Sequence, residues 1–365
     1  MAELTMLELS DELQWRTVLR HVYQSDFYYL PEYHSIAEDQ GEGHARLFVY
    51  SDRKFIMAIP LLLRPLAETT ELAEIAGDWQ DATSVYGYAG PLASHADMPA
   101  TVVKGFKTAL SAALQEQKVV TLFTRLHPLI PQADWIRGMG KRNVLGQTVS
   151  IDLALPLAQQ RSKYRANHRQ DVNRLRRLGI VSYPVHSEEH WGRFIDIYYQ
   201  TMDRVHASRR YFFDRSDFDA LRTRLGTTLT LFVCQWHDEI ICGGLFSLHQ
   251  GIVQYYLGGT RNGYLKYAPM KLLFDSVRIW ATQRKARIFH LGGGIGSNED
   301  SLFQFKAGFS DQRHVFSIWK WILQPKVYGQ LCVKKREINQ RKGMKVMESG
   351  YFPEYRNPAL EQGVE

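Results

Sequence analysis

The sequence has 365 residues, of which 45% are apolar, and a formal net charge of +7. At roughly 150 residues per domain, this length favours two or three domains with a sizeable core. The three cysteines are odd in number and lack metal-type spacing, so they argue against a disulfide framework and favour reduced thiols in a cytoplasm. The positive charge predicts an anionic partner such as phosphate, nucleic acid or a membrane surface, although an ordinary basic enzyme fits equally well.

Neither a signal peptide nor a membrane span is expected. Residues 1–9 contain two glutamates and no basic stretch. The longest apolar run covers residues 55–63 and contains Pro60, which is far short of the roughly 20 residues that a span requires. We therefore expect a soluble, cytoplasmic protein.

The first half predicts a helix, a hairpin, a second helix and a strand, in that order. The first helix begins after Ser10 and ends near Gln24. Strands are predicted at 47–50 and 55–63, and the second helix begins with Pro99 in its first turn. An apolar strand over 119–123 follows. A mixed sheet covered by helices is the expected outcome.

An arginine-rich segment connects the two halves. Read as one helix over 161–177, it places an apolar stripe beside a row of four arginines. The stripe consists of Tyr164, Val172, Leu175 and Leu178, and the row consists of Arg161, Arg165, Arg169 and Arg176. Guanidinium groups bind phosphate oxygens in pairs, so the row predicts a phosphate site. A solvated basic helix is the alternative.

The second half repeats the order of the first. A helix begins after Ser187, strands are predicted at 231–234, 240–248 and 251–257, a helix begins at Pro269, and a strand covers 287–291. The order and nearly the spacing of the first half are kept. A repeat of this length indicates a domain duplication, with a cleft between the copies in which a large substrate can lie.

The first copy contains an insertion of about 14 residues between its hairpin and its second helix. The inserted segment includes Asp81, Tyr86 and Tyr88. Such residues can hold a polar ring, for example a sugar, by stacking and hydrogen bonds. A rigid loop whose aromatic rings cover the edge of the core is an equally good interpretation.

Residues 291–309 contain the strongest chemical signal. Four glycines, among them Gly293 and Gly294, directly follow a strand, so the backbone can approach a ligand closely. Asp300 begins a short predicted helix in which Lys306 lies among aromatic residues such as Phe305. A lysine in such surroundings either pairs with a carboxylate or meets an anionic ligand.

Other catalytic patterns are weak. The glycine spacing does not fit a dinucleotide fingerprint, no Walker lysine follows, and zinc-protease, deaminase and nucleophile-elbow motifs are missing. No metal site is expected. The basic stretch that contains Lys334, Lys335, Arg336 and Lys345 could touch RNA or a membrane surface, but a solvated helix is the preferred interpretation.

These features together resemble the FemAB-like, or BioF2-like, branch of the GNAT acyltransferase superfamily, over about residues 5–320. The resemblance rests on the doubled element order, the loop at 86–92, the arginine-rich connector and the strip from Leu291 to Phe309. It implies an α/β (α+β) fold of two tandem GNAT-like domains, each a mixed twisted sheet with flanking helices. The expected ranges are 1–155 for the first domain, 156–180 for a basic connecting helix, 181–323 for the second domain and 324–365 for a C-terminal helical tail.

The resemblance also implies an activity. It predicts transfer of an aminoacyl or acyl group from aminoacyl-tRNA or acyl-CoA to an amine of a cell-envelope or surface-polysaccharide precursor, with no tightly bound cofactor. The acceptor would be a nucleotide-activated or lipid-linked sugar. Contact with tRNA or with a membrane surface is a further expectation, and contact with DNA is not expected.

Single residues receive roles from the same resemblance. Lys306 matches the family lysine near the reacting or phosphate-binding centre. Arg165 and Arg169 fall where family members carry basic residues for the nucleotide diphosphate, and Tyr256 lies where GNAT sheets open for the acyl donor. Asp300, His290 and Asp81 are alternatives for the general base. The wider set of predicted substrate-binding residues is Arg165, Arg169, Tyr86, Tyr88, Asp81, Gly293, Gly294 and Phe305.

One segment departs from the family pattern. Acetyl-CoA-dependent GNAT proteins have closely spaced glycines before the second helix, whereas this chain has Gly263 followed by Tyr-Leu-Lys-Tyr-Ala-Pro-Met. The departure favours an aminoacyl-tRNA donor over CoA. Two other functions remain open: a nucleic-acid-binding protein without catalysis, for which few aromatic residues are interleaved with the charges, and a degenerate GNAT scaffold.

Overall fold

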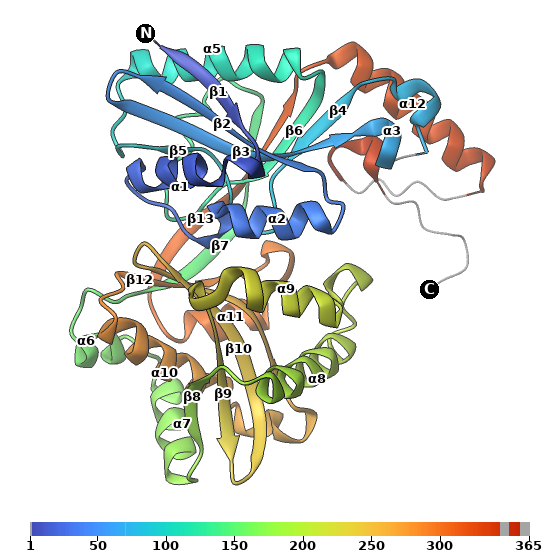
Figure 1. Cartoon of the computed structure of the whole chain (residues 1–365). Coiled ribbons are helices and arrows are strands. Elements are labelled where there is room, and N and C mark those ends of the chain that lie inside the picture. The colour runs from blue at the N-terminus through green and yellow to red at the C-terminus, as the bar shows by residue number, and fades with distance from the viewer. Residues whose placement is uncertain (1, 70, 344–349, 358–365) are drawn as a thin grey trace. The chain divides into compact units, whose positions relative to one another are not determined.

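The structure is a computed structural model that describes residues 2–69, 71–343 and 350–357. The chain forms two compact units. Unit 1 comprises Met1–Gln24, Tyr28–Leu145 and Phe316–Glu365, and unit 2 comprises Ser25–Phe27 and Gly146–Val315. Each unit is a mixed sheet with flanking helices, so the predicted α/β fold class is confirmed (Figure 1).

Unit 1 contains a sheet with the strand order β1-β2-β3-β4-β6-β13, and β5 pairs with β3. The pair β4 and β6 is parallel, and the other described strand pairs of unit 1 are antiparallel. The strands are β1 Glu3–Leu7, β2 His44–Asp52, β3 Phe55–Pro65, β4 Gln80–Thr83, β5 Leu92–Ala93, β6 Val119–Arg125 and β13 Gln312–Ile322.

Unit 2 contains the order β7-β12-β11-β10-β9-β8. Its parallel pair is β11 and β12, and its other pairs are antiparallel. The strands are β7 Lys141–Asp152, β8 Val181–Val185, β9 Leu229–Trp236, β10 Glu239–His249, β11 Ile252–Thr260 and β12 Ile288–Gly292.

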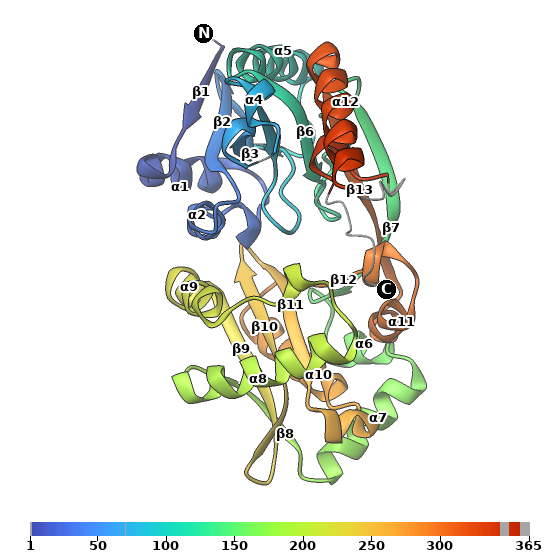
Figure 2. The same ribbon diagram turned by 90° about the vertical axis from the view of Figure 1, so that its right-hand side faces the viewer.

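Helices cover both faces of each sheet. In unit 1, α5 lies along one face of β1 to β3, and α1 and α2 lie on the other (Figure 1). In unit 2, α8 and α10 pack on opposite faces of the hairpin β9–β10 (Figure 2). The helices are α1 Glu12–His21, α2 Pro31–Asp39, α3 Leu66–Thr69, α4 Ala73–Ala76, α5 Ala100–Glu116, α6 Leu157–Ser162, α7 Ala166–Arg177, α8 Glu188–Arg204, α9 Arg215–Leu225, α10 Met270–Gln283, α11 Ser301–Ala307 and α12 Pro325–Arg341.

Local sequence explains where these helices begin. Ser187 caps α8, because its side chain accepts a hydrogen bond from the backbone N–H of His190. Pro99 and Pro269 occupy the caps of α5 and α10, where a missing N–H costs nothing. The predicted helices, hairpins and apolar strands of both halves are confirmed.

The last strand of each unit comes from the other half of the sequence. In unit 1, Ile318–Ile322 of β13 pair with β6, and in unit 2, Val149–Asp152 of β7 pair with β12. Both strands run across a unit boundary. The two halves therefore exchange their final strands, and chain order does not coincide with unit membership at β7 and β13.

The arginine-rich segment differs from the single predicted helix. It forms α6 and α7, with a break at residues 163–165. The chain turns there because the Tyr164 side chain is buried against Phe309, at 5.1 Å between ring centroids, and the Arg165 N–H donates to Gly308 O at 2.8 Å. Val172 and Leu175 are buried as predicted, whereas Leu178 ends the helix and is exposed.

The C-terminal segment is helical over α12. Residues 344–349 and 358–365 of the predicted tail, including Lys345, lie outside the described residues. Lys335 and Lys342 pair with Glu71, and Arg336 pairs with Glu354, so part of this basic stretch is neutralised. In the part of the chain that the structure describes, no helix is both long and apolar enough to cross a membrane.

Candidate functional site

The parallel strands β11 and β12 separate partway along their length. Their register runs from Ile252 paired with Ile288 to Gln254 paired with His290. Among the described residues the pairing stops there, although β11 continues to Thr260. Beyond Gln254, the facing edge of β11 is therefore not paired with β12, and the two strands leave an opening between them. We call this opening the β11–β12 gap.

A β-bulge lies at the start of the gap. Leu245 of β10 pairs with Leu257, but the next residue, Phe246, pairs with Tyr255, so Tyr256 is the extra residue. A bulge bends its strand and redirects a backbone group and a side chain. Tyr256, predicted to lie where the sheet opens, is thus placed at that point, with its ring 5.4 Å from the ring of Phe27.

Lys306 extends from α11 to the glycine strip. Its Nζ donates to Gly293 O at 2.6 Å and lies 5.6 Å from the centre of the Tyr255 ring. The side chain is buried, with 6% exposure. In the described part of the chain no carboxylate forms an ion pair with it. An ammonium has three N–H donors, so two of them remain for a ligand.

Burial changes the acidity of this lysine. Desolvation lowers the pKa of Lys306 from 10.5 to about 8, and the charge of Asp300 opposes the shift. At neutral pH the side chain is still mainly an ammonium. Such a shifted, buried group beside an opening is typical of a functional site.

Asp300 gives the glycine strip its shape. One of its carboxylate oxygens accepts from Phe303 N at 2.9 Å, which caps α11, and the other accepts from Ile295 N at 3.0 Å. A Cβ atom on Gly294 would lie 2.3 Å from Asp300 Oδ1 and 2.1 Å from Asn298 O, so only glycine fits there. A Cβ on Gly293 would lie 2.9 Å from Gln147 O on β7.

His290 and Phe305 lie in the interior of unit 2. His290 is fully buried on β12, and its ring nitrogens bond to Gln254 Oε1 at 2.6 Å and Thr148 Oγ1 at 2.8 Å. Phe305 packs against Phe274, with ring centroids 5.5 Å apart, and so anchors α11 to α10. Sequence reasoning missed Gln254 and Thr148. For Gln254 the available signal was a polar residue after the apolar pair Ile252 and Val253, whereas Thr148 lies in a largely polar strand and gave no such signal.

Arg165 and Arg169 belong to the same unit as Lys306. Arg165 caps α7 and donates to the backbone and side-chain oxygens of Gln304 on α11, at 3.3 and 3.1 Å. Arg169 donates to Ser162 O at 3.1 Å and to Tyr164 O. In the described structure, neither arginine pairs with a carboxylate.

Arg313, which sequence reasoning missed, lies near Arg165. Burial lowers the pKa of Arg313, and the charge of Arg165 lowers it further. Its guanidinium lies 5.5 Å from the ring centre of Phe303, so the two arginines approach α11 together.

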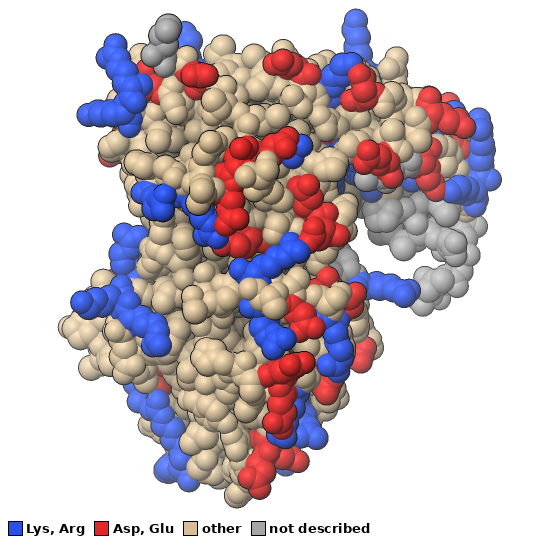
Figure 3. Space-filling view, viewed as in Figure 1, with Lys and Arg blue, Asp and Glu red and all other residues tan. Residues whose placement is uncertain are grey.

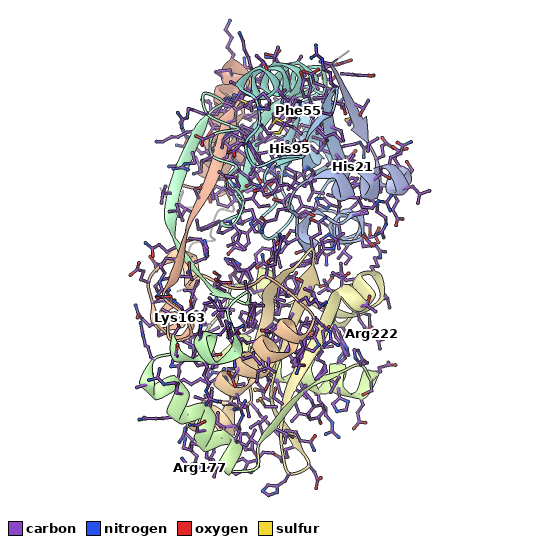
Figure 4. All side chains as sticks on the ribbon, turned by 90° about the vertical axis from the view of Figure 1, so that its left-hand side faces the viewer. His21, Phe55, His95, Lys163, Arg177 and Arg222 are labelled. Carbon is purple, nitrogen blue, oxygen red and sulfur yellow. The ribbon has the colours of Figure 1, made fainter. Side chains whose placement is uncertain are left out.

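The four arginines of the connector are not equivalent. Arg176 pairs with the buried Asp275 at 2.7 Å, which ties α7 to α10, and Arg161 donates to Asn173 Oδ1 at 2.5 Å. Lys163 and Arg177, near the two ends of the segment, are labelled in Figure 4. On the face drawn in Figure 3, basic side chains follow the edge at α7, while both signs are mixed over α8 and α9.

The remaining predicted residues lie in unit 1. Asp81 is fully buried and pairs with Arg64, at 2.5 Å, and with Arg356. The ring of Tyr88 packs against that of Tyr28 at 5.7 Å. Tyr86 is 41% exposed, and the Arg125 guanidinium lies 5.8 Å from its ring centre.

Unit 2 thus combines an open parallel strand pair, a bulge and a buried ammonium, an arrangement suited to holding a carbonyl and stabilising negative charge on its oxygen. Residues 162–306, most of this unit, match the family model of the acetyltransferase (GNAT) domain. This part of the chain is therefore a GNAT-type acetyltransferase domain. Among the described residues, no group of three or more His, Cys, Asp or Glu is placed to hold a metal ion.

Solved structures share the fold of most of the chain. The crystal structure of FemX has a TM-score of 0.70 and 11% identity, and the match covers 90% of this chain and 99% of that one. The structure of L-PGS from Bacillus licheniformis has a TM-score of 0.53 and 14% identity, with 85% and 91% covered. The C-terminal domain of a putative lysylphosphatidylglycerol synthetase from Agrobacterium fabrum has a TM-score of 0.54 and 14% identity, with 91% and 97% covered.

A comparison with curated protein sequences finds no significant match. The GNAT domain match and the FemX-like fold confirm the predicted resemblance to the FemAB-like branch of the GNAT superfamily. At these low identities, the solved structures establish the fold.

Proposed function

We propose that the protein transfers an aminoacyl or acyl group from an activated ester or thioester to an amine of a cell-envelope or surface-polysaccharide precursor. The observation that carries the proposal is Lys306, a buried ammonium that donates to Gly293 O and lies at the glycine-lined side of the β11–β12 gap. The catalytic part of the chain then corresponds to the predicted range 181–323, together with the connecting segment.

The donor carbonyl lies in the gap. Backbone N–H groups of residues 255–258 and Nζ of Lys306 stabilise the oxyanion that forms when the amine nitrogen attacks the carbonyl carbon. The bond from this carbon to the donor oxygen or sulfur then breaks, and the proton lost by the nitrogen passes to the leaving atom. No covalent enzyme intermediate is required, because alignment of two large substrates supplies much of the rate enhancement.

The acceptor phosphates bind beside α11 in this proposal. Arg165, Arg169 and Arg313 donate to neutral oxygens in the described structure, so their charge is available to an anion. Bidentate guanidinium contacts suit a diphosphate, as in a nucleotide-activated or lipid-linked sugar. Tyr86 and Tyr88, both of unit 1, remain proposed sugar-contacting residues.

The start of α10 supports an aminoacyl ester as donor. Residues Asn262–Tyr267 form a 3-10 helix before α10, and this stretch lacks closely spaced glycines. Fewer backbone N–H groups can therefore face the pyrophosphate of CoA. One structural neighbour is named a putative lysylphosphatidylglycerol synthetase, which is in keeping with an aminoacyl donor. Aminoacyl-tRNA is therefore the first donor to test and acyl-CoA the second.

The experiment combines purified protein with charged tRNA or acyl-CoA and with amine-bearing nucleotide-sugar and lipid-linked acceptors, and detects acyl products by mass spectrometry. Replacing Lys306 with alanine is expected to lower kcat/KM by about 100-fold or more. Lys104→Ala, on the exposed face of α5, is the matched control and should leave the rate unchanged.

Three outcomes would contradict the proposal. Full activity of Lys306→Ala would remove the lysine from the mechanism. Salt-sensitive RNA binding without transfer would favour a nucleic-acid-binding protein, and failure to bind any donor or acceptor would indicate a degenerate scaffold.

A further inference from the structure

A three-residue segment of the N-terminal half belongs to unit 2. Ser25–Phe27 lie between chain segments of unit 1, yet each of the three contacts β11 or the turn before it. The Ser25 N–H donates to Gln250 Oε1 at 2.9 Å, Asp26 Oδ2 accepts from Gln254 Nε2 at 2.7 Å, and the Phe27 ring lies 5.4 Å from that of Tyr256. This segment therefore contacts β11 on either side of the point where the gap begins.

Asp26 is the first member of a buried hydrogen-bond chain. Gln254 connects Asp26 to His290 Nδ1 at 2.6 Å, and His290 Nε2 bonds to Thr148 Oγ1 at 2.8 Å. All four side chains are at most 1% exposed. Burying four polar groups, one of them a carboxylate, costs free energy that a core of apolar residues would not.

The contacts fix the tautomer of His290. Only the NH₂ group of Gln254 can donate to a carboxylate, so its oxygen faces the histidine and accepts a hydrogen bond. In the neutral ring the proton is then on Nδ1, and Nε2 accepts from the Thr148 hydroxyl. The acceptor on Asp26 thus determines the orientation of Gln254 and, through it, of the imidazole.

This chain of hydrogen bonds lies where β11 and β12 separate. Gln254 and His290 are the last paired residues of β11 and β12, and Thr148 extends the connection to β7. A Cβ on Gly293 would lie 3.7 Å from Thr148 Cγ2, and Gly293 O is the acceptor for Lys306. The same hydrogen bonds therefore join three strands at the point from which the gap and the lysine are positioned.

We infer that Asp26 is a positioning residue for acyl transfer. Through Gln254, His290 and Thr148 it fixes where β11 and β12 separate, and so the distance between the β11 amides and Lys306. This inference rests on the proposed function of the gap. Asp26 comes from the N-terminal half of the sequence, so that half contributes a determinant to the site of unit 2.

The first measurement is the tautomer. In ¹⁵N-histidine-labelled protein, the His290 ring is expected to carry its proton on Nδ1, and the resonance is assigned by its absence from His290→Gln. Asp26→Ala removes the carboxylate that accepts from the Gln254 NH₂ group, and should convert this single form into a mixture. Asp26→Asn retains an oxygen acceptor and should keep the wild-type tautomer.

The second measurement is the rate. Because a small misplacement of reacting groups costs up to about 100-fold, Asp26→Ala should lower kcat by about 10-fold or more with little change in the acceptor KM, and Asp26→Asn should restore it. Tyr164→Phe removes a buried hydrogen bond to Asp275 elsewhere in unit 2 and is the control, with kcat within about twofold of wild type. If Asp26→Ala does not fold, Thr148→Val tests the other end of the chain and should show the same loss of kcat.

The outcomes separate this inference from the proposed function. A wild-type ring protonated on Nε2, or a kcat unchanged in Asp26→Ala and Thr148→Val, would overturn the positioning role while leaving acyl transfer intact. A wild-type protein that transfers no acyl group would refute the proposed function and, with it, the role of Asp26. In that case the measured tautomer of His290 would still test whether the hydrogen bonds from Asp26 to Thr148 form.

Discussion

The two units have the same strand order but differ at their parallel strand pair, which is β11–β12 in unit 2 and β4–β6 in unit 1. In unit 2, β11 is continuous apart from its one-residue bulge, and it separates from β12 after Gln254. In unit 1, the corresponding strand is interrupted by residues 84–91, which divide it into β4 and β5. In unit 1 the contact with β6 extends one residue beyond the end of β4, where the Ser84 N–H donates to Phe123 O at 3.0 Å.

The inserted loop is firmly attached to unit 1. Thr124 Oγ1 donates to Ala89 O at 3.1 Å, and Gln132 Nε2 donates to Pro91 O at 2.8 Å. Gly87 has a φ of +123°, and a Cβ atom on it would lie 2.1 Å from the Tyr28 ring. In unit 1 the loop thus fills the strand edge, and we call this unit the filled copy. In unit 2 the corresponding edge is open, and this open copy contains the buried Lys306.

The largest expected effect comes from the filled copy. Asp81→Asn leaves the Arg64 and Arg356 guanidinium groups without their buried counter-ion, so the free energy of unfolding should fall by about 3 kcal/mol. Chemical denaturation measures this loss.

Asp78→Asn is the matched control, because Asp78 is exposed and pairs with Lys118 at the surface. It should leave stability unchanged. Equal effects of the two substitutions would show that the buried network does not hold the filled copy together.

The next effect concerns the open copy and depends on pH. The pKa of Lys306, about 8 in the folded protein, lies below the 10.5 of an ordinary lysine, so the unfolded chain binds more protons between these values. The contribution of Lys306 to the free energy of unfolding is therefore most unfavourable below about pH 8 and improves as the pH rises to 10.5.

Lys306→Met removes this dependence. The variant should be more stable than wild type at pH 7, and the difference should shrink towards pH 10.5 by about 3 kcal/mol. Wild-type kcat should decline above about pH 8, because the ammonium is the form that stabilises an oxyanion. An increase of kcat across that range would assign the lysine a role as a base instead.

A smaller effect is expected at the glycine strip. Gly294→Ala forces a Cβ against Asn298 O and Asp300 Oδ1, and should reduce stability by about 1–3 kcal/mol. Gly329→Ala in α12 has no atom within 4 Å of the added Cβ and should be neutral or stabilising by about 0.5 kcal/mol. Thermal denaturation of both variants tests the difference, which would vanish if the strip could relax freely.

The smallest effect is expected at Tyr86 in the filled copy. Its side chain is 41% exposed, so Tyr86→Ala should change stability by less than about 0.5 kcal/mol. Loss of ring stacking on a sugar should raise the acceptor KM about fivefold, which steady-state kinetics would detect. An unchanged acceptor KM would show that Tyr86 does not contact the sugar, and the loop would then serve to fill the strand edge.

Much of the architecture could be predicted because it depends on local patterns. The apolar periodicity of α1 and α8, the prolines before α5 and α10 and the capping residue Asp300 all act within a few residues of the elements they define. The edge strand β8 was missed because it is partly exposed and contains Pro184.

The site was only partly predictable, because its geometry depends on long-range partners. Lys306 was identified from its apolar neighbours, but its contact with Gly293 O and its lack of a carboxylate required the fold. Asp26 gives no local signal, since its partner Gln254 lies 228 residues further along the chain. The break in the arginine segment likewise depends on the burial of Tyr164 against Phe309.

Because β7 and β13 are exchanged, neither half of the sequence encodes a complete sheet by itself. A recombinant piece that stops after the first repeat would carry β7 without the neighbour β12 and would leave β6 without β13. Once such an exchange had arisen, neither repeat could be lost, shuffled or inherited alone without exposing a bare sheet edge. The strand exchange therefore makes each repeat depend on the other for a complete sheet. We expect unit 1, which lacks the buried Lys306, to be retained wherever unit 2 is functional.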